Sequence, residues 1–208
     1  VTQPANANFG EEWSLLSILS RVSYEYKNKY FLNATVRRDG SSRFGPNTKW
    51  GTFPSVSGAW LVSDESFMQN VKAINSLKLR LSYGQTGNNL IPNYGSVSLL
   101  GTSSYVNGTT VVNGLRTISI SNPNLKWEKT AQTNIGIDMA MLKNRINVTL
   151  DVYKSVTKDM LLNVPVPAYT GFTTQLTNIG SMENKGFELG INSRNVEKKS
   201  WSWSTDFN

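Results

Sequence analysis

Apolar and polar residues alternate with a period of two along most of this chain of 208 residues. The segment 145–153 is the clearest case, because isoleucine, valine and leucine fill its even-numbered positions and mainly polar residues lie between them. Since successive side chains of a strand point to opposite faces, this pattern predicts β-strands. About eight such segments are found, at roughly 14–26, 30–39, 53–63, 76–86, 127–141, 145–157, 183–194 and 200–208. One helical turn is predicted, over 65–71.

The predicted strands are long, and the connections between them alternate in length. Several strands exceed ten residues, whereas strands of globular proteins usually have about five or six. Short polar turns at 27–29, 143–144 and 197–199 alternate with long connections at 40–52, 87–126 and 158–182, and the segment 64–75 breaks this rule. Such asymmetry is typical of an outer-membrane β-barrel. A soluble β-sandwich has the same alternation within its strands, so the alternation alone leaves both architectures open.

Charged residues predict which face of each strand would contact lipid in a barrel. Lys78 and Arg80 alternate with leucines, and a basic side chain at the middle of the membrane costs roughly 2–4 kcal/mol. The leucine face is therefore expected outside and the basic face in the lumen. Arg38 has the parity of the apolar side chains of its strand, so it is expected to point outward and reach the headgroups. Carboxylates with the parity of the luminal face are Asp138, Asp151, Glu188 and Asp206.

Composition excludes several kinds of chemistry. The chain has no cysteine and no histidine, which removes disulfides, thiolate and histidine nucleophiles and the usual zinc sites. We expect no catalytic residues, no metal site and no cofactor. The net charge of +7 is scattered along the sequence rather than gathered in one segment, so nucleic acid is not expected as a partner. No apolar run is long enough for a transmembrane helix.

Two pairs of residues resemble catalytic pairs, and strand geometry argues against both. Ser155 and Lys158 match a Ser-x-x-Lys pattern, which requires the two side chains to lie one helical turn apart. On a strand, residues separated by three or five positions point to opposite faces, which also separates Glu183 from Glu188. Neither pair is expected to form a catalytic site.

The long connections contain the candidate binding residues. The segment 88–126 has no charged residue before Arg116 and is rich in asparagine, glycine, serine and threonine. This composition suits a surface loop that stacks on and hydrogen-bonds to sugars or peptides, and it equally suits a loop without a ligand. The candidate contacts with a ligand or partner are Tyr94, Tyr105, Tyr169 and Phe172.

The sequence resembles, in four ordered blocks, the barrel of SusC/RagA-type TonB-dependent outer-membrane transporters. The blocks are RRDGSSRFGPNTKWGTFP (37–54), SLKLRLSYGQTGN (76–88), NPNLKWEKTAQTNIGID (122–138) and TNIGSMENKGFELGI (177–191). The resemblance covers most of residues 14–208 and implies an all-β fold. This fold is an antiparallel up-and-down meander of about eight strands, part of a large barrel of the roughly 22-stranded type. Residues 1–208 would be one partial barrel domain, a fragment without the plug domain and the remaining strands.

The resemblance also gives the first block a role as an external loop, and not as a cradle for phosphate. The residues of this motif are Asp39, Gly40, Ser41, Ser42, Arg43, Phe44 and Gly45. Asp39 and Gly40 would end one strand, and Arg43 and Lys49 would anchor the loop. Trp50 and Phe53 would then begin the next strand at the membrane interface.

By this resemblance, the protein would reside in the bacterial outer membrane, surrounded by its lipid, and import an oligosaccharide or a peptide. Its partners would be a SusD-like surface lipoprotein over the external face and the TonB complex, which would act through the missing plug region. Two alternatives stay open. One is a TonB receptor of the siderophore or cobalamin type, and the other is a soluble β-sandwich module that binds carbohydrate.

Overall fold

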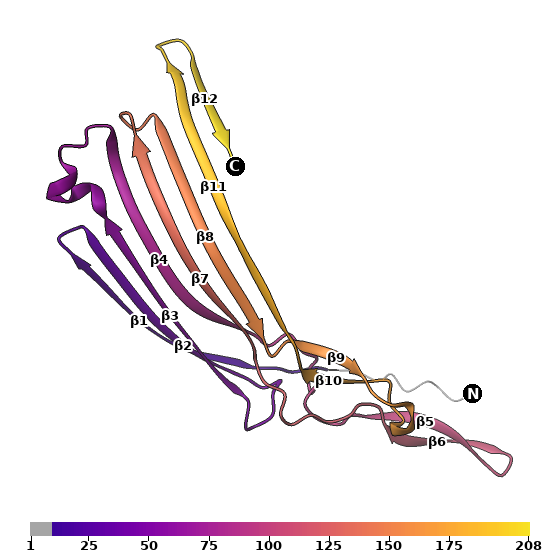
Figure 1. The fold of residues 1–208 in the computed structure, drawn as a ribbon. Helices are drawn as coiled ribbons and strands as arrows, with labels where there is room; N and C mark the ends of the chain where they lie inside the picture. Colours follow the sequence, from indigo (N-terminus) through magenta and orange to yellow (C-terminus); the bar gives the residue numbers. More distant parts are fainter. Residues whose placement is uncertain (1–9) are drawn as a thin grey trace.

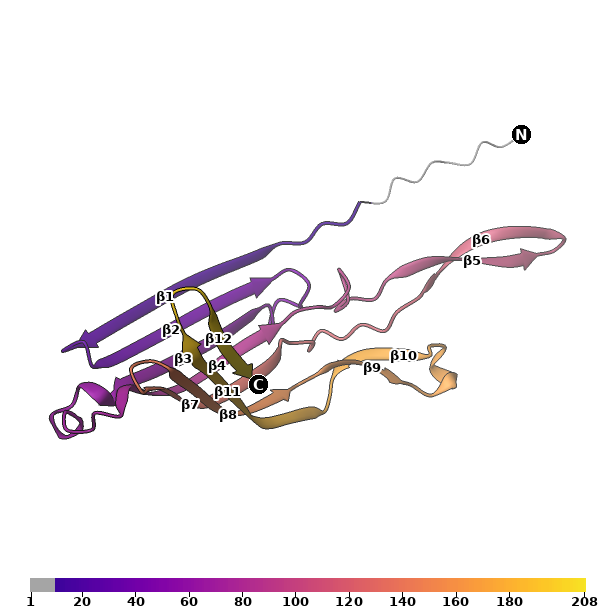
Figure 2. The ribbon, with the colours of Figure 1, turned by 90° about the horizontal axis from the view of Figure 1, so that it is seen from above.

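The structure is a computed structural model that describes residues 10–208, and long antiparallel strands dominate it (Figure 1). One sheet has eight strands in the order β1-β2-β3-β4-β7-β8-β11-β12. Their bounds are β1 Leu15–Tyr26, β2 Tyr30–Ser41, β3 Trp50–Leu61, β4 Ile74–Asn88, β7 Glu128–Met141, β8 Ile146–Lys158, β11 Ser181–Glu197 and β12 Ser202–Phe207. Apart from two inserted hairpins, strands that are neighbours in the chain are neighbours in the sheet, which confirms the predicted meander. The sheet is curved like a section of a barrel wall (Figure 2).

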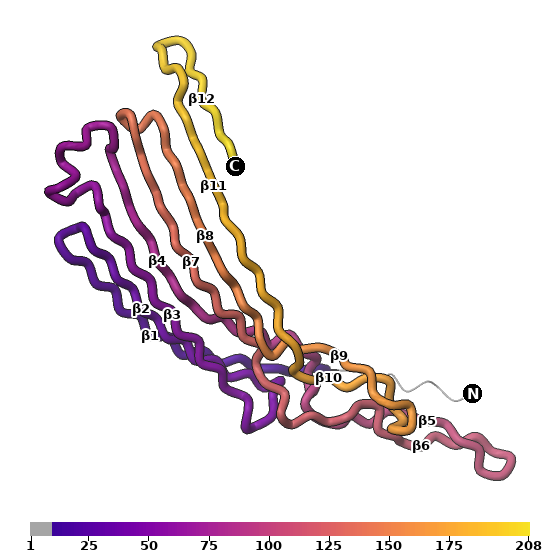
Figure 3. Tube along the Cα trace, in the orientation of Figure 1, coloured from indigo at the N-terminus to yellow at the C-terminus, as the bar shows by residue number. Residues whose placement is uncertain are grey.

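The connections also follow the predicted asymmetry, with the long excursions at one end of the sheet and the short turns at the other (Figure 3). The link between β3 and β4, at the end of the short turns, is the expected exception. The excursions contain two hairpins that the sequence pattern did not predict. One is formed by β5 (Leu100–Asn107) and β6 (Thr110–Thr117), and the other by β9 (Leu161–Pro165) and β10 (Thr174–Asn178). They make small sheets of their own beyond the end of the main sheet (Figure 1). A short 3-10 helix, η3 (Ala168–Thr170), lies at the tip of the second hairpin.

The link between β3 and β4 differs from the predicted helical turn at 65–71. It contains two 3-10 helices, η1 (Val62–Asp64) and η2 (Ser66–Met68), and Glu65 between them has extended backbone. The Glu65 carboxylate accepts hydrogen bonds from the Tyr30 hydroxyl at 2.6 Å and from Trp60 Nε1 at 3.1 Å. The Glu65 carboxylate fixes the link against the start of β2 and the end of β3. The extended backbone of Glu65 separates the two 3-10 helices, so no continuous helix forms.

Strand register sorts the side chains of the main sheet into an apolar face and a polar face. One row of directly paired residues crosses seven strands and consists of Tyr26, Tyr30, Trp60, Leu79, Ile137, Leu150 and Leu189. The next row continues the apolar face and includes Phe187, which is 75% exposed. Lys78 and Arg80 lie on the polar face, where they are paired across the strands with Asp138 and Gly136, respectively. The predicted division of the strands is therefore confirmed.

A single sheet with an exposed apolar face is incompatible with the β-sandwich alternative, in which two sheets pack face to face over a shared core. Within residues 10–208, the strands form one large sheet and two separate hairpins. The buried apolar residues gather mainly at the end of the sheet where the long connections meet. In the same part of the chain, no helix is long and apolar enough to span a membrane.

Candidate binding surface of the loops and the polar face

The long connections share one buried cluster, which we name the loop-end core: Phe44, Phe53, Ile91, Leu125 and Trp127. The Trp127 ring lies 5.3 Å from that of Phe44 and 5.4 Å from that of Phe53, measured between centroids. Trp127 Nε1 also donates a hydrogen bond to the carbonyl of Lys49 at 3.0 Å. Leu161 and Leu176, on β9 and β10, pack against the same cluster. The three long connections are therefore held together as one unit.

The place of Phe53 corrects the prediction that it lies at the membrane interface. Its side chain is only 3% exposed, inside the loop-end core, whereas that of Trp50 is 41% exposed. Phe53 is paired with Arg37, and Trp50 with Gly40, so the two aromatics lie on opposite faces of β3. Trp50 is on the apolar face, together with Arg38, whose guanidinium lies 5.2 Å from the Trp50 ring centroid. The outward position predicted for Arg38 is thus confirmed.

The first motif residues belong to β2 rather than ending it, because the strand continues through Ser41. Asp39 is buried and accepts a hydrogen bond from Arg37 Nε at 2.8 Å. Gly40 lies under Trp50, whose ring would be 2.8 Å from a Cβ at this position. Ser41 is fully buried, and its Oγ accepts hydrogen bonds from Asn89 Nδ2 at 3.0 Å and from Arg43 N at 3.3 Å. These contacts attach the end of β2 to the β4–β7 connection.

Ser42 and Arg43 extend the attachment to the segment before β1. The Ser42 amide donates to the carbonyl of Ser14 at 3.0 Å, and its Oγ accepts from the Ser14 amide at 2.8 Å. The Arg43 guanidinium lies 4.5 Å from the Trp13 ring centroid, and its Nε donates to Asn93 Oδ1 at 3.0 Å. Gly45 approaches the β4–β7 connection so closely that a Cβ would lie 2.9 Å from the carbonyl oxygen of Pro123. Arg43 thus joins segments of this chain to one another, as expected of an anchor of the loop.

Two of the four aromatic candidates converge. Tyr94 and Phe172 line one hollow of about 400 Å³ between the β4–β7 connection and the β9–β10 hairpin, which we name the loop hollow. Polar side chains that also line it include Asn93, Arg116, Asn163 and Gln175. Tyr105 and Tyr169 do not line it, and they are 57% and 91% exposed. A half-exposed tyrosine, a phenylalanine, an arginine and amides suit a sugar ring or a peptide.

The convergence at the loop hollow was not predictable from the sequence. Arg116 is on β6, whereas Asn163 and Gln175 are on β9 and β10. No local spacing signal joins these residues, which come from two connections that lie far apart in the sequence and meet at one end of the sheet. Tyr94 has a φ of 63°, in the left-handed region that a tyrosine rarely adopts, and the sequence gives no sign of this either.

The polar face carries a charge network that crosses three strands. Arg80 donates to Asp138 on β7 through Nε at 2.8 Å, and one of its terminal nitrogens reaches Asp151 on β8 at 3.0 Å. Asn134 donates to the other oxygen of Asp151 at 2.9 Å. The guanidinium crosses over Gly136, where a Cβ would lie 2.6 Å from Arg80 Cζ. Arg80, Asp138 and Asp151 thus lie on one face, as predicted, and the structure shows that they form direct ion pairs.

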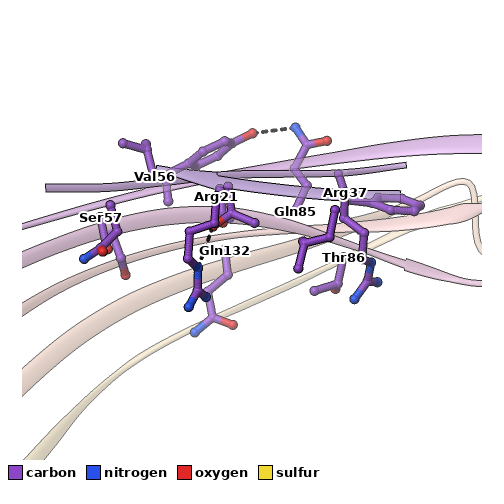
Figure 4. A pocket seen from close by; sticks show the side chains of 15 residues that line it. Arg21, Arg37, Val56, Ser57, Gln85, Thr86 and Gln132 are labelled. Carbon is purple, nitrogen blue, oxygen red and sulfur yellow. Dashed lines mark hydrogen bonds between the residues drawn. The ribbon is translucent and has the colours of Figure 1, made fainter. Parts of the chain in front are cut away.

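A groove of about 670 Å³ lies beside this network, on β1 to β4 and β7 (Figure 4). Figure 4 shows Arg21, Arg37, Ser57 and Gln132 on one side of the sheet and Val56 on the other. Arg21 donates to the Thr35 hydroxyl at 3.3 Å and has no carboxylate partner within residues 10–208. The groove therefore offers cationic, hydroxyl and amide groups to a polar molecule in contact with this face. Within the same residues, no group of acidic side chains could hold a metal ion.

Comparison with known proteins identifies a family model and several relatives that match nearly the whole chain. The family described as "TonB dependent receptor-like, beta-barrel" matches residues 7–208. The chain is 44% identical over 195 residues to TonB-dependent receptor P39 of Formosa agariphila, a match that covers 94% of this chain and 18% of the relative. It is 38% identical over 201 residues to TonB-dependent receptor SusC of Bacteroides thetaiotaomicron, covering 94% of this chain and 20% of SusC.

Solved structures show the same fold. The RagAB peptide importer in its "closed-closed" state matches with a TM-score of 0.86 at 35% identity, over 94% of this chain and 21% of the importer chain. This chain thus spans about a fifth of the length of the curated relatives that it matches. Each match covers nearly all of this chain but only about a fifth of the relative.

Proposed function

Since the chain belongs to the TonB-dependent receptor-like β-barrel family, we propose that it is part of the wall of a transporter that imports glycans or peptides across the outer membrane. The observation that carries this proposal is the similarity, over 94% of the chain, both to SusC and to the RagAB peptide importer. The same similarity favours glycans or peptides over siderophores and cobalamin. Residues 1–208 would form one partial barrel domain, completed by a plug and further strands of the same protein.

The two faces of the sheet take different roles in this proposal. The apolar face, with its exposed leucines and Phe187, contacts the lipid of the outer membrane. The polar face, with the Arg80 network and the Arg21–Arg37 groove, lines the lumen. A hydrated wall of paired charges and hydroxyl groups allows a polar substrate to pass without binding tightly. The long connections then lie on the external side, as in other outer-membrane barrels.

The loop hollow is the proposed place where this segment contacts substrate or partner. Tyr94 and Phe172 present aromatic surface there, and both belong to connections that contribute residues to the loop-end core or pack against it. Tyr105 and Tyr169 are on the exposed hairpins, where they would contact a SusD-like surface lipoprotein covering the external face. Energy would come from the TonB complex through the plug. None of these roles requires catalysis, a metal or a cofactor.

Uptake by cells that express the full-length protein tests the proposal. Cells would be supplied with fluorescent oligosaccharides or with fluorescent peptides, with TonB present or deleted. We expect uptake of at least one probe class, and we expect TonB deletion to abolish it. Equal uptake in both strains would contradict the proposal.

Variants of the hollow refine the same assay. Tyr94→Ala combined with Phe172→Ala is expected to lower uptake several-fold, because stacking of an aromatic ring contributes roughly 0.5–1.5 kcal/mol beyond burial. Val111→Ala is the control, since Val111 lies on the β6 hairpin, is exposed and does not line the hollow. Unchanged uptake by the double variant would remove the hollow from the substrate path.

A further inference from the structure

The apolar face of the sheet carries four lysines at its loop end. These residues, which we name the lysine patch, are Lys129, Lys154, Lys158 and Lys185. Lys154 is paired directly with Lys185 across β8 and β11, and Lys129 is paired with Lys158 across β7 and β8. All four are exposed. The two lysine–lysine pairs thus lie on one face of three neighbouring strands, four residues apart along β8.

The charge of the lysine patch is mostly unbalanced. Glu183 is two residues from Lys185 on the same face and pairs with Lys154 at 3.0 Å. Among the ion pairs of residues 10–208, none includes Lys129, Lys158 or Lys185. The other acidic side chains of β7, β8 and the facing part of β11 are on the polar face, as the register with Arg80 and its partners requires. Like charges directly opposite one another destabilise a sheet, so an anion from outside the chain would relieve this arrangement.

The patch lies where the lipid-facing surface ends. The row just before it is apolar and contains Ile135, Val152 and Phe187, directly paired across the same three strands. Lys154 and Lys185 come two residues further toward the long connections, in the next row. Lysine stems extend along apolar surface while the ammonium groups reach polar surroundings. With the long connections outside, the ammonium groups are at the level of the external headgroups.

We propose that the lysine patch binds the phosphate groups of an anionic glycolipid in the outer leaflet. Ammonium groups act as compact point charges for phosphate, and each lysine pair offers two such charges to one phosphate group. Glu183 keeps Lys154 oriented along the sheet while the other ammonium groups stay free. The inference rests on the proposed orientation of the segment, with its apolar face in lipid and its long connections outside.

Native mass spectrometry of the full-length protein in detergent tests this site. The probes are bisphosphorylated lipid A and the same lipid without its phosphates. Lys154→Gln combined with Lys185→Gln is expected to weaken binding of the phosphorylated lipid by roughly tenfold or more, since each lysine near an anionic surface contributes about 1 kcal/mol. Lys27→Gln combined with Lys199→Gln, in short turns at the opposite end of the sheet, is the matched control and should bind like the unmodified protein.

Three results would overturn the proposal. The first is that the patch variant binds phosphorylated lipid A as well as the unmodified protein does, and the second is that the unmodified protein binds the lipid equally well without its phosphates. The third is displacement of the lipid by excess inorganic phosphate. The last result would assign the site to free phosphate. A melting curve checks that the patch variant is folded, and Lys129→Gln combined with Lys158→Gln replaces it if it is not. Failure here is distinguishable from failure of the proposed function, because TonB-dependent uptake is measured separately and would persist without lipid binding.

Discussion

Gly136 leaves the space through which Arg80 reaches across β7 to Asp151. A Cβ at this position would lie 2.6 Å from the guanidinium carbon and from an oxygen of Asp151. Gly136→Ala should therefore displace the guanidinium, break the contact with Asp151 and lower the free energy of unfolding by about 1 kcal/mol. Denaturant unfolding of the full-length protein in lipid vesicles measures this change. Gly190→Ala is the control, because the nearest atom to a Cβ there is 3.6 Å away, and an equal effect of both substitutions would contradict the account.

Glu65 makes the β3–β4 link sensitive to pH. The hydrogen bond from the Tyr30 hydroxyl, followed by that from Trp60, holds the pKa of Glu65 below its ordinary value of 4.5. Because the pKa is lower in the folded state, the contribution to stability is present above 4.5 and is lost as the pH falls through the folded value. Glu65→Gln should thus lower the melting temperature at neutral pH, and the difference from the unmodified protein should shrink in acid. A difference that does not change with pH would refute this role.

The face of the sheet on which a side chain lies could be predicted from the alternation along its strand. Contacts between residues of different loops could not, because they depend on how the chain folds. Arg80 and Asp138 share one face because both alternate with apolar residues in adjacent strands. Parity could also have placed Phe53 on the polar face of β3. It shares the parity of Ser55, whereas Pro54 and Val56 point to the apolar face. The loop hollow is different, because Tyr94 and Phe172 are far apart in the sequence and no period relates them.

Among the elements, the loop-end core decides whether the long connections form one unit. Trp127 contacts Phe44 and Phe53 and bonds to the Lys49 carbonyl. Trp127→Ala should destabilise the loop unit by roughly 3–5 kcal/mol and accelerate protease cleavage within 89–127 and 159–180. Limited proteolysis of the full-length protein in outer-membrane vesicles measures the rate. Trp127→Phe, which keeps an aromatic ring and loses the hydrogen bond, should give a much smaller effect, and equal cleavage of all three proteins would count against the core.

The eight strands of the main sheet were predictable because apolar and polar residues alternate along each of them. The hairpins β5–β6 and β9–β10 were not, because they are short or rich in serine, threonine and asparagine, and they bury neither face in the main sheet. The β9–β10 hairpin is positioned by packing of Leu161 and Leu176 on the loop-end core, which local alternation does not encode. The extension of β2 through Ser41 was missed for a related reason, since glycine and serine in sequence favour a turn and the contact of Ser41 with Asn89 overrides that preference.

At the scale of the whole molecule, the sheet has an apolar face and two outer strands, β1 and β12, each paired on one side only within residues 10–208. Both features are unfavourable for a sheet alone in water. We propose that lipid covers the apolar face and that further strands of the same protein pair with β1 and β12. The polar face then encloses part of a hydrated lumen.

A cysteine scan along β8 in the full-length protein tests this arrangement most directly, and the 208 residues contain no cysteine of their own. Spin labels would be attached one at a time within 146–158 and exposed, in a lipid bilayer, to oxygen, which concentrates in lipid, and to a water-soluble nickel complex. We expect a period of two, with Val148 and Leu150 accessible to oxygen and Thr149 and Tyr153 shielded from it. Loss of this alternation, or oxygen access on the side of Thr149, would contradict the assignment of β8 to the wall of a membrane barrel.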